Sequence, residues 1–311
     1  LPRVQFVMEN GKKLPLTSEE KEKIVEASQQ MSNNALRVLA VAKKDVSKDD
    51  PWNSELEENL TFLGLVGMID PPREEVKASI AQCYDAGIKT VMITGDHQAT
   101  ALAIAKDLGI ATDIDETMTG KRLDQISDIA LQEEVKRVKV FARVTPEHKV
   151  RIVEALKANG FIVSMTGDGV NDAPSLKQAD VGVAMGITGT DVAKGAADIV
   201  LTDDNFATIV SAVERGRNIF QNIKKSILFL LSCNLGEITA LFIGILLGLP
   251  APLTAVQILW VNLITDTLPA IALGMDPDDP DVMKAKPRNP KESVFAHGNG
   301  TYTLLNGILI G

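Results

Sequence analysis

Residues 165–174 read Met-Thr-Gly-Asp-Gly-Val-Asn-Asp-Ala-Pro, which sets two carboxylates and a carboxamide among glycines directly after an apolar run. The run Phe161–Met165 predicts a buried strand, Ala173–Gln178 predicts the helix after it, and the glycines allow a sharp turn between them. Asp168 and Asp172 can then face one hard cation, because Mg²⁺ is usually held by one or two carboxylates with phosphate oxygens and water. The stretch predicts a magnesium and phosphate site; a polar turn without a ligand is the alternative.

A second strand end of the same kind lies upstream. The apolar run over residues 88–93 ends in a Thr-Gly-Asp turn at 94–96, and a helix is predicted over 98–108. Because ligands bind outside the carboxyl ends of strands in open α/β sheets, both Thr-Gly-Asp turns are expected to face one crevice. A threonine hydroxyl and the backbone N–H groups at a helix start suit a phosphate oxyanion.

A third strand end lies between these two turns, where residues 141–149 read Phe-Ala-Arg-Val-Thr-Pro-Glu-His-Lys. Proline in the first turn is typical of a helix start, so a helix is predicted after the strand. Lys149 could then reach the crevice and meet transferring phosphate as a point charge. Taken alone, Lys149 would be interpreted as an ordinary solvated lysine on a helix.

The order of these motifs resembles the phosphorylation domain of P-type cation-transporting ATPases, which belong to the haloacid-dehalogenase-like superfamily. The similarity rests on Thr-Gly-Asp at 94–96, Arg-x-x-Pro-x-x-Lys at 143–149 and Thr-Gly-Asp-Gly-Val-Asn-Asp-Ala-Pro at 166–174. It continues through Val-Gly-Val-Ala-Met-Gly at 181–186, Gly-Thr at 189–190 and Asp-Asp-Asn-Phe at 203–206. The resemblance implies an α/β fold with a Rossmann-like phosphorylation domain.

The resemblance also implies the site residues, with Mg²⁺ and ATP as cofactors. Asp168 and Asp172 would bind Mg²⁺. The residues implied in catalysis are Thr94, Gly95, Lys149, Asp168, Asn171 and Asp172. Those implied in contacts to ATP or its supporting shell are Arg37, Thr94, Gly95, Asp96, Arg143, Lys149 and Asn171.

One departure from the family pattern concerns the nucleophile. The family's phosphorylated aspartate lies in an Asp-Lys-Thr-Gly-Thr motif, and neither this string nor the actuator-domain motif Thr-Gly-Glu-Ser occurs in these 311 residues. We therefore expect a fragment of a longer pump, whose actuator domain and other membrane helices are its partners. Without a nucleophile the isolated fragment is expected to be inactive, because covalent transfer of phosphate needs one.

Two apolar stretches predict a transmembrane hairpin. Ile227–Leu249 carries Glu237 as its only charge and Leu253–Gly274 carries Asp266 alone, and each stretch is about 20 residues long, enough to cross a bilayer. Lysines and arginines flank both outer ends, which favours a multi-pass membrane protein with these ends and the phosphorylation domain in the cytoplasm. Buried helices of a large soluble protein are the alternative.

Polar side chains inside the predicted spans indicate an ion site, because ionisable groups in a membrane are costly and usually functional. Their spacings of three and four place each set on one helix face. They offer carboxylate, amide and hydroxyl oxygens, which Ca²⁺ prefers. Hydrogen bonding between helices is the alternative for the amides and the hydroxyl. The candidate ligands are Asn234, Glu237, Asn262, Thr265 and Asp266.

The hairpin is similar to the fifth and sixth membrane helices of sarco/endoplasmic-reticulum-type calcium pumps. The residues that carry this similarity are Asn-Leu-Gly-Glu at 234–237, Trp-Val-Asn-Leu-Ile-Thr-Asp at 260–266, and Leu-Pro-Ala at 268–270. The resemblance implies ATP-driven Ca²⁺ transport through an aspartyl-phosphate. Pumps for Na⁺, K⁺, H⁺ or Mn²⁺, a soluble haloacid-dehalogenase-like phosphatase and a channel-like or regulatory membrane protein stay open as alternatives.

The remaining features set the organisation of the chain. A net charge of −9 with 23% charged residues gives no support to nucleic-acid binding. Cys83 and Cys233 are expected to be reduced thiols, and the three histidines are expected to be solvated or supporting residues. A helix without proline is expected to run from Phe206 into the first span. The expected domains are the α+β tail of a nucleotide-binding domain (1–56), the phosphorylation domain (57–205), a stalk helix (206–226), two transmembrane helices (227–274), a cytoplasmic loop (275–301) and the start of another transmembrane helix (302–311).

Overall fold

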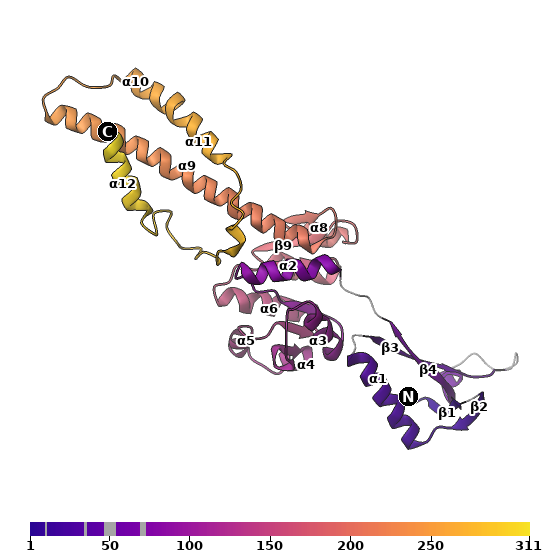
Figure 1. Ribbon diagram of the computed structural model, residues 1–311. Helices are drawn as coiled ribbons and strands as arrows, with labels where there is room; N and C mark the ends of the chain where they lie inside the picture. Colours follow the sequence, from indigo (N-terminus) through magenta and orange to yellow (C-terminus); the bar gives the residue numbers. More distant parts are fainter. Residues whose placement is uncertain (10, 34–35, 47–53, 69–72) are drawn as a thin grey trace. The chain divides into compact units, whose positions relative to one another are not determined.

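The computed structural model describes residues 1–9, 11–33, 36–46, 54–68 and 73–311, and the chain divides into two compact units (Figure 1). One unit comprises Leu1–Ile80 and Thr90–Asn205, and the other comprises Ala81–Lys89 and Phe206–Gly311. The first unit contains all the strands that the structure describes, and the second is helical. The fold is therefore a mixed α/β architecture followed by long apolar helices.

The first unit begins with a four-stranded sheet in the order β2-β1-β4-β3. β1 pairs antiparallel with β2 and parallel with β4, and β3 pairs antiparallel with β4. Helix α1 begins after a capping box, in which the Thr17 N–H donates to Glu20 at 2.8 Å and the Glu20 N–H donates to Thr17 Oγ1 at 3.2 Å. The bounds are Val4–Glu9 (β1), Lys12–Pro15 (β2), Ser18–Asn33 (α1), Arg37–Lys43 (β3), Ser54–Glu57 (η1) and Leu60–Met68 (β4).

Two three-stranded parallel sheets follow, in the orders β5-β7-β6 and β10-β9-β8. Each strand leads into a helix or a turn, as in alternating α/β folds. The strands are Met92–Thr94 (β5), Thr117–Thr119 (β6), Val140–Ala142 (β7), Ser164–Gly167 (β8), Val181–Met185 (β9) and Ile199–Leu201 (β10). The helices are Glu74–Asp85 (α2), Gln98–Asp107 (α3), Ile114–Glu116 (η2), Gly120–Leu123 (α4), Asp128–Glu134 (α5), Pro146–Ala158 (α6), Val170–Asp172 (η3), Ala173–Gln178 (α7) and Asp191–Ala196 (α8).

One hydrophobic core cluster joins the two parallel sheets. Phe141 of β7, Ile152 of α6 and Leu176 of α7 are at most 1% exposed and belong to this cluster together with Met165 of β8. Burying large side chains of this kind contributes about 1.5–3 kcal/mol each. The core therefore fixes the three strand ends that carry the predicted motifs.

The structure corrects two predicted strands in this part. The strand expected at Phe161–Met165 begins at Ser164, and Phe161 and Ile162 are exposed, so the apolar run is not a buried strand over its whole length. The strand expected over 88–93 begins at Met92. In both cases the apolar run starts in the connection before the strand, which hydrophobicity alone cannot separate from a strand. The predicted helix Ala173–Gln178 is confirmed.

Other expected segments fall partly outside the described residues. The residue pattern also predicts strands over 35–42 and 63–69, which are observed as β3, beginning at Arg37, and as β4. The sequence further predicts a polar loop over 44–53 and a stiff turn over 70–73; most of the loop and three of the four residues of the turn lie outside the described residues.

The second unit is built around one helix of 41 residues, α9, which runs without a break from Phe206 to Leu246 (Figure 1). The prediction of a continuous helix into the first span is therefore confirmed. Helices α11 and α12 pack against α9. Gly236 and Gly307 allow the close contact of α9 with α12, because a Cβ on Gly307 would lie 2.7 Å from Leu235. The other elements are Ala255–Trp260 (α10), Val261–Asp266 (η4), Thr267–Gly274 (α11), Val282–Lys284 (η5) and Asn299–Ile310 (α12).

The segment after α11 is tied to the first half of α9. Arg217 donates to the carbonyl oxygens of Ala86, Val282 and Ala285 at 3.1, 3.1 and 2.8 Å. Asn222 donates to the Asp276 carbonyl at 2.8 Å. Burial lowers the pKa of Arg217, and its guanidinium donates hydrogen bonds to the three carbonyl oxygens just named. The first half of α9 is therefore held by these hydrogen bonds as well as by the helices packed against it.

Candidate functional site

The carboxyl ends of β5 and β7 are joined by their backbones. The Val144 N–H donates to the Thr94 carbonyl at 3.3 Å, and the Arg143 N–H donates to the Asp96 carbonyl at 3.1 Å. Arg143 has a φ of 52°, so the chain turns sharply there. The Thr94 hydroxyl donates to the Asp96 carboxylate at 3.0 Å. The Thr-Gly-Asp turn and the Arg143 turn thus form one polar edge.

Asp172 is the most strongly held side chain at the end of β8. It is 6% exposed, and its carboxylate accepts from Lys149 Nζ at 2.5 Å and from the backbone N–H groups of Asp168 and Gly169 at 3.2 and 3.1 Å. Burial by itself raises the pKa of Asp172, but the bonds from Lys149 and Gly169 outweigh it, and the pKa lies below its usual value. Asp172 therefore stays ionised and links Lys149 to the turn.

The predicted site residues fall into two groups. Lys149 and Asp172 meet directly, while the side chains of Asp168 and Asn171 are exposed at the same turn. Thr94 and Asp96 meet each other and the Arg143 backbone. Within the described residues, no hydrogen bond or ion pair connects one group to the other. Arg37 lies exposed at the first position of β3.

The arrangement suits a magnesium ion that takes part of its coordination from phosphate. Among the described residues, no three His, Cys, Asp or Glu side chains lie close enough together to hold a metal ion by themselves. Asp168 offers an exposed carboxylate, and its backbone N–H donates to the Asp172 carboxylate. Since Mg²⁺ commonly uses one or two carboxylates and keeps water or phosphate oxygens, this donor set fits it.

Gly167 is required by the packing at this turn. A Cβ added to Gly167 would lie 2.4 Å from the Asp172 Cβ. Gly167→Ala is expected to lower the free energy of unfolding by about 1–3 kcal/mol, because overpacking typically costs this much and here displaces Asp172. Gly169→Ala is the matched control, because its Cβ would lie 3.6 Å from the nearest atom, and its effect is expected to be smaller. Equal midpoints for both variants in thermal unfolding would contradict this account.

A second carboxylate that the sequence did not single out shapes the loop after β9. Asp204 accepts from the N–H groups of Gly186, Ile187 and Thr188 at 2.6, 3.0 and 2.7 Å. Backbone hydrogen bonds, the largest from Ile187, lower the pKa of Asp204 to about 2. The only signal for this role in the sequence is the acidic pair at 203–204, which is typical of many surface turns.

The hairpin brings two of the five predicted ion ligands into direct contact, and a third is buried. Asn262 Nδ2 lies 3.2 and 3.3 Å from the two carboxylate oxygens of Glu237. Asp266 is 4% exposed, and its Oδ2 has no hydrogen-bond partner in the described structure. Cys233 interacts with both acids and was missed as a neighbour of this site, although it lies four residues before Glu237 on the same helix.

The structure does not bring Asn234 and Thr265 to this contact, because both are exposed. For Thr265, the expectation of a shared helix face assumed a regular α-helix. Residues 261–266 instead form a wider π-helical turn, in which the Thr267 hydroxyl donates to the Asn262 carbonyl at 2.8 Å. Within this turn Asp266 is buried and Thr265 is exposed.

Two segments of the chain match known protein families. Residues 1–75 match the family described as P-type ATPase, cytoplasmic domain N, and residues 250–311 match the family described as cation transporting ATPase, C-terminus. In these two regions the chain is similar to P-type cation-transporting ATPases. Two helices, Phe206–Leu246 and Ala255–Gly274, are long and apolar enough to cross a membrane.

The individual relatives are named for calcium. The chain is 65% identical to calcium-transporting ATPase 1 of Bacillus cereus and 53% identical to a calcium-transporting ATPase of Bacillus subtilis, in each case over its whole length and 35% of the relative. It is 45% identical to an endoplasmic reticulum calcium ATPase of Aspergillus fumigatus, over its whole length and 33% of that protein. The chain thus spans about a third of the length of the curated relatives it matches.

Proposed function

We propose that this chain is part of a pump that moves Ca²⁺ across a membrane at the expense of ATP through an aspartyl-phosphate intermediate. The observation that carries the proposal is the Asp266 carboxylate, which is buried in an apolar hairpin and has one oxygen without a hydrogen-bond partner in the described structure. Cys233 interacts with both Asp266 and Glu237, so the two acids have a common neighbour. An acid in such surroundings needs a cation or a proton, and oxygen ligands favour Ca²⁺.

The α/β part would be a haloacid-dehalogenase-like phosphorylation domain. In this proposal Asp168 and Asp172 bind Mg²⁺, Lys149 neutralises the transferring phosphate, and Thr94 and Gly95 hold its oxygens. The support is the ion pair between Lys149 and Asp172 beside the exposed Asp168. Mg²⁺ would supply charge neutralisation at the phosphate. Contacts to ATP or its supporting shell are proposed for Arg37, Asp96, Arg143 and Asn171.

The acceptor aspartate would come from the part of the pump beyond these residues. β5 and β8 are both edge strands of their sheets, and the predicted phosphate turns follow their carboxyl ends. An unpaired strand edge can accept another strand. We propose that the strand carrying the aspartate pairs there, with the phosphorylation domain in the cytoplasm of a multi-pass membrane protein. The division into domains at residues 56, 205, 226, 274 and 301 belongs to the same proposal.

The test is phosphoenzyme formation from ATP by the complete pump, measured with and without Ca²⁺. The parent is expected to form an acid-stable phosphoenzyme only with Ca²⁺. Asp168→Asn is expected to reduce this by about 100-fold or more, since a hard cation loses a charged ligand. Asp107→Asn is the control, because Asp107 is exposed and forms a surface ion pair with Lys77 at 3.5 Å.

The outcomes separate the candidates. Activation by another cation in place of Ca²⁺ would assign the pump to that cation. A soluble phosphatase would hydrolyse small phosphate esters without any dependence on Ca²⁺, and such a result would refute the transport proposal.

A further inference from the structure

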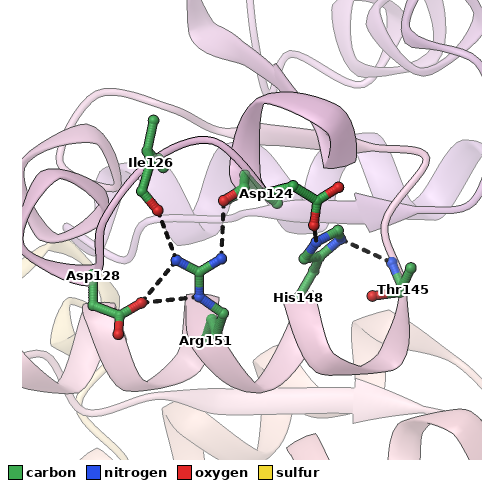
Figure 2. A network of polar contacts seen from close by, with 7 residues as sticks. Asp124, Ile126, Asp128, Thr145, His148 and Arg151 are labelled. Carbon is green, nitrogen blue, oxygen red and sulfur yellow. Dashed lines mark hydrogen bonds and ion pairs between the residues drawn. The ribbon is translucent and has the colours of Figure 1, made fainter.

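His148 is buried next to Lys149 and makes two hydrogen bonds that the proposed chemistry does not use. It is 5% exposed. Its Nδ1 lies 3.1 Å from the backbone nitrogen of Thr145, and its Nε2 lies 2.7 Å from Asp124 Oδ1 (Figure 2). Because the Thr145 N–H can only donate, Nδ1 is the acceptor, and Nε2 carries the proton and donates to Asp124.

The first of these bonds caps helix α6. His148 is the third residue of the helix, where Glu or Gln usually reaches back to the backbone N–H of the capping residue. Here the imidazole supplies the acceptor. Its second nitrogen binds a side chain 24 residues away, so the cap is also anchored to the segment after α4. A Glu could make the first bond but would repel Asp124.

The turn around His148 leaves little room for adjustment. Gly120 lies against it, and a Cβ at this position would be 2.2 Å from the Arg143 carbonyl oxygen and 3.2 Å from His148 Cε1. Arg143 itself has a positive φ of 52°. The connection from β7 to α6 is therefore fixed on one side by the backbone of Arg143 and on the other by the imidazole ring.

Arg151 holds the same segment one turn further along α6, as Figure 2 shows. Its guanidinium donates to Asp128 Oδ1 at 2.9 Å and to the carbonyls of Leu123 and Ile126 at 2.9 and 3.0 Å. Arg151 thus anchors the body of the helix and makes no bond to the capping residue. His148 differs from Arg151 because its one side chain bonds both to Thr145 at the helix start and to Asp124 in the segment after α4.

Lys149 is the residue next to His148 and forms the 2.5 Å contact with Asp172. We propose that His148 is a positioning residue for the phosphate site: it fixes the first turn of α6 to Thr145 and Asp124, and thereby sets where the Lys149 ammonium lies. The inference rests on the proposed function, because it takes Lys149 to meet the phosphate. His148 itself touches neither phosphate nor metal in this scheme.

The test measures the affinity of the complete pump for inorganic phosphate, together with its thermal midpoint. His148→Leu removes both bonds and is expected to weaken phosphate binding about fivefold, the size of a lost helix cap. His148→Gln supplies an acceptor for Thr145 and a donor for Asp124, and it is expected to restore the affinity to within about twofold. Failure of Gln to restore binding in a folded pump would overturn the proposal.

Arg151→Met is the matched control for a purely structural effect. It removes an anchor of the same helix and is expected to lower the thermal midpoint while changing phosphate affinity by less than about twofold. If Arg151→Met weakens phosphate binding as much as His148→Leu does, His148 only stabilises the domain and the proposal is wrong.

A double-mutant cycle with Lys149→Met separates this inference from the proposed function. If His148 acts through Lys149, the effect of His148→Leu disappears when Lys149 is already Met, since coupled residues are not additive. If the losses in phosphate affinity caused by the two substitutions add, the inference about His148 is wrong while the proposed function stands. Unchanged phosphate affinity in Lys149→Met would remove Lys149 from the phosphate site, and the inference would fall with it.

A second variant covers the case in which His148→Leu does not fold. His148→Glu keeps the acceptor for Thr145 but repels Asp124, and it is expected to bind phosphate about threefold more weakly. Adding Asp124→Asn removes the repulsion and is expected to restore the affinity. Equal phosphate affinity in the parent, the Glu variant and the double variant would overturn the proposal.

Discussion

Asp266→Asn in the complete pump is expected to raise the Ca²⁺ concentration needed for phosphoenzyme formation by on the order of 100-fold, because a charged ligand is lost in surroundings of low dielectric constant. Asp266 is 4% exposed, and one of its carboxylate oxygens has no hydrogen-bond partner in the described structure. Asparagine keeps the volume and removes only the charge. Calcium-dependent phosphorylation by ATP provides the measurement.

The control for Asp266→Asn is Asp281→Asn. Asp281 is exposed and pairs with Lys284 at 2.6 Å, so the same chemical change there is expected to leave calcium activation as in the parent. Phosphorylation from inorganic phosphate without Ca²⁺ reports whether the phosphate site of Asp266→Asn is intact. An unchanged calcium requirement in a variant that passes this check would refute the ion-site proposal.

A Gly-Gly-Ser insertion at Asn222 is expected to uncouple ATP hydrolysis from transport. Helix α9 runs unbroken from Phe206 to Leu246 and carries Glu237, so a flexible joint would end its ability to transmit a displacement. The calcium transported per ATP hydrolysed is expected to fall by about tenfold or more, provided that α9 moves between two packings. Vesicle uptake and phosphate release measured in parallel give this ratio.

The same insertion after Ala251, in the turn between α9 and α10, is the matched control. It lengthens the chain by the same residues outside every helix, and loops tolerate such insertions well. Its transport ratio is expected to stay close to that of the parent. Full coupling in the Asn222 insertion would contradict the role of α9 as a rigid connection.

The sequence predicted most of the features that depend on neighbours along the chain. Helix α7 has the expected bounds, and α9 continues into the first apolar stretch as expected, because both follow from local periodicity and the absence of proline. The strand expected from Phe161 was wrong at its start, since an apolar run says nothing about which of its residues the sheet will bury.

Features that depend on distant partners were not predictable. The roles of His148 and Cys233 follow from contacts with Asp124 and Asp266, which are 24 and 33 positions away in the chain. Thr265 was expected on one helix face with Asn262 and Asp266 because a regular helix was assumed, and no simple pattern in the sequence signals a π-helical turn. Asp172 was expected as a metal ligand, but its hydrogen bonds to the turn became visible only in the structure.

The wide turn at residues 261–266 gives the second apolar helix a mechanical property that a regular helix lacks. A π-helical turn holds about one residue more than an α-helical turn. The helix can become a regular α-helix here only if this extra residue moves into a neighbouring turn. Such a shift would swing Asn262 and Asp266 around the helix axis relative to Glu237. The hairpin therefore has a built-in way to open and close its oxygen cluster while its backbone hydrogen bonds are exchanged one at a time.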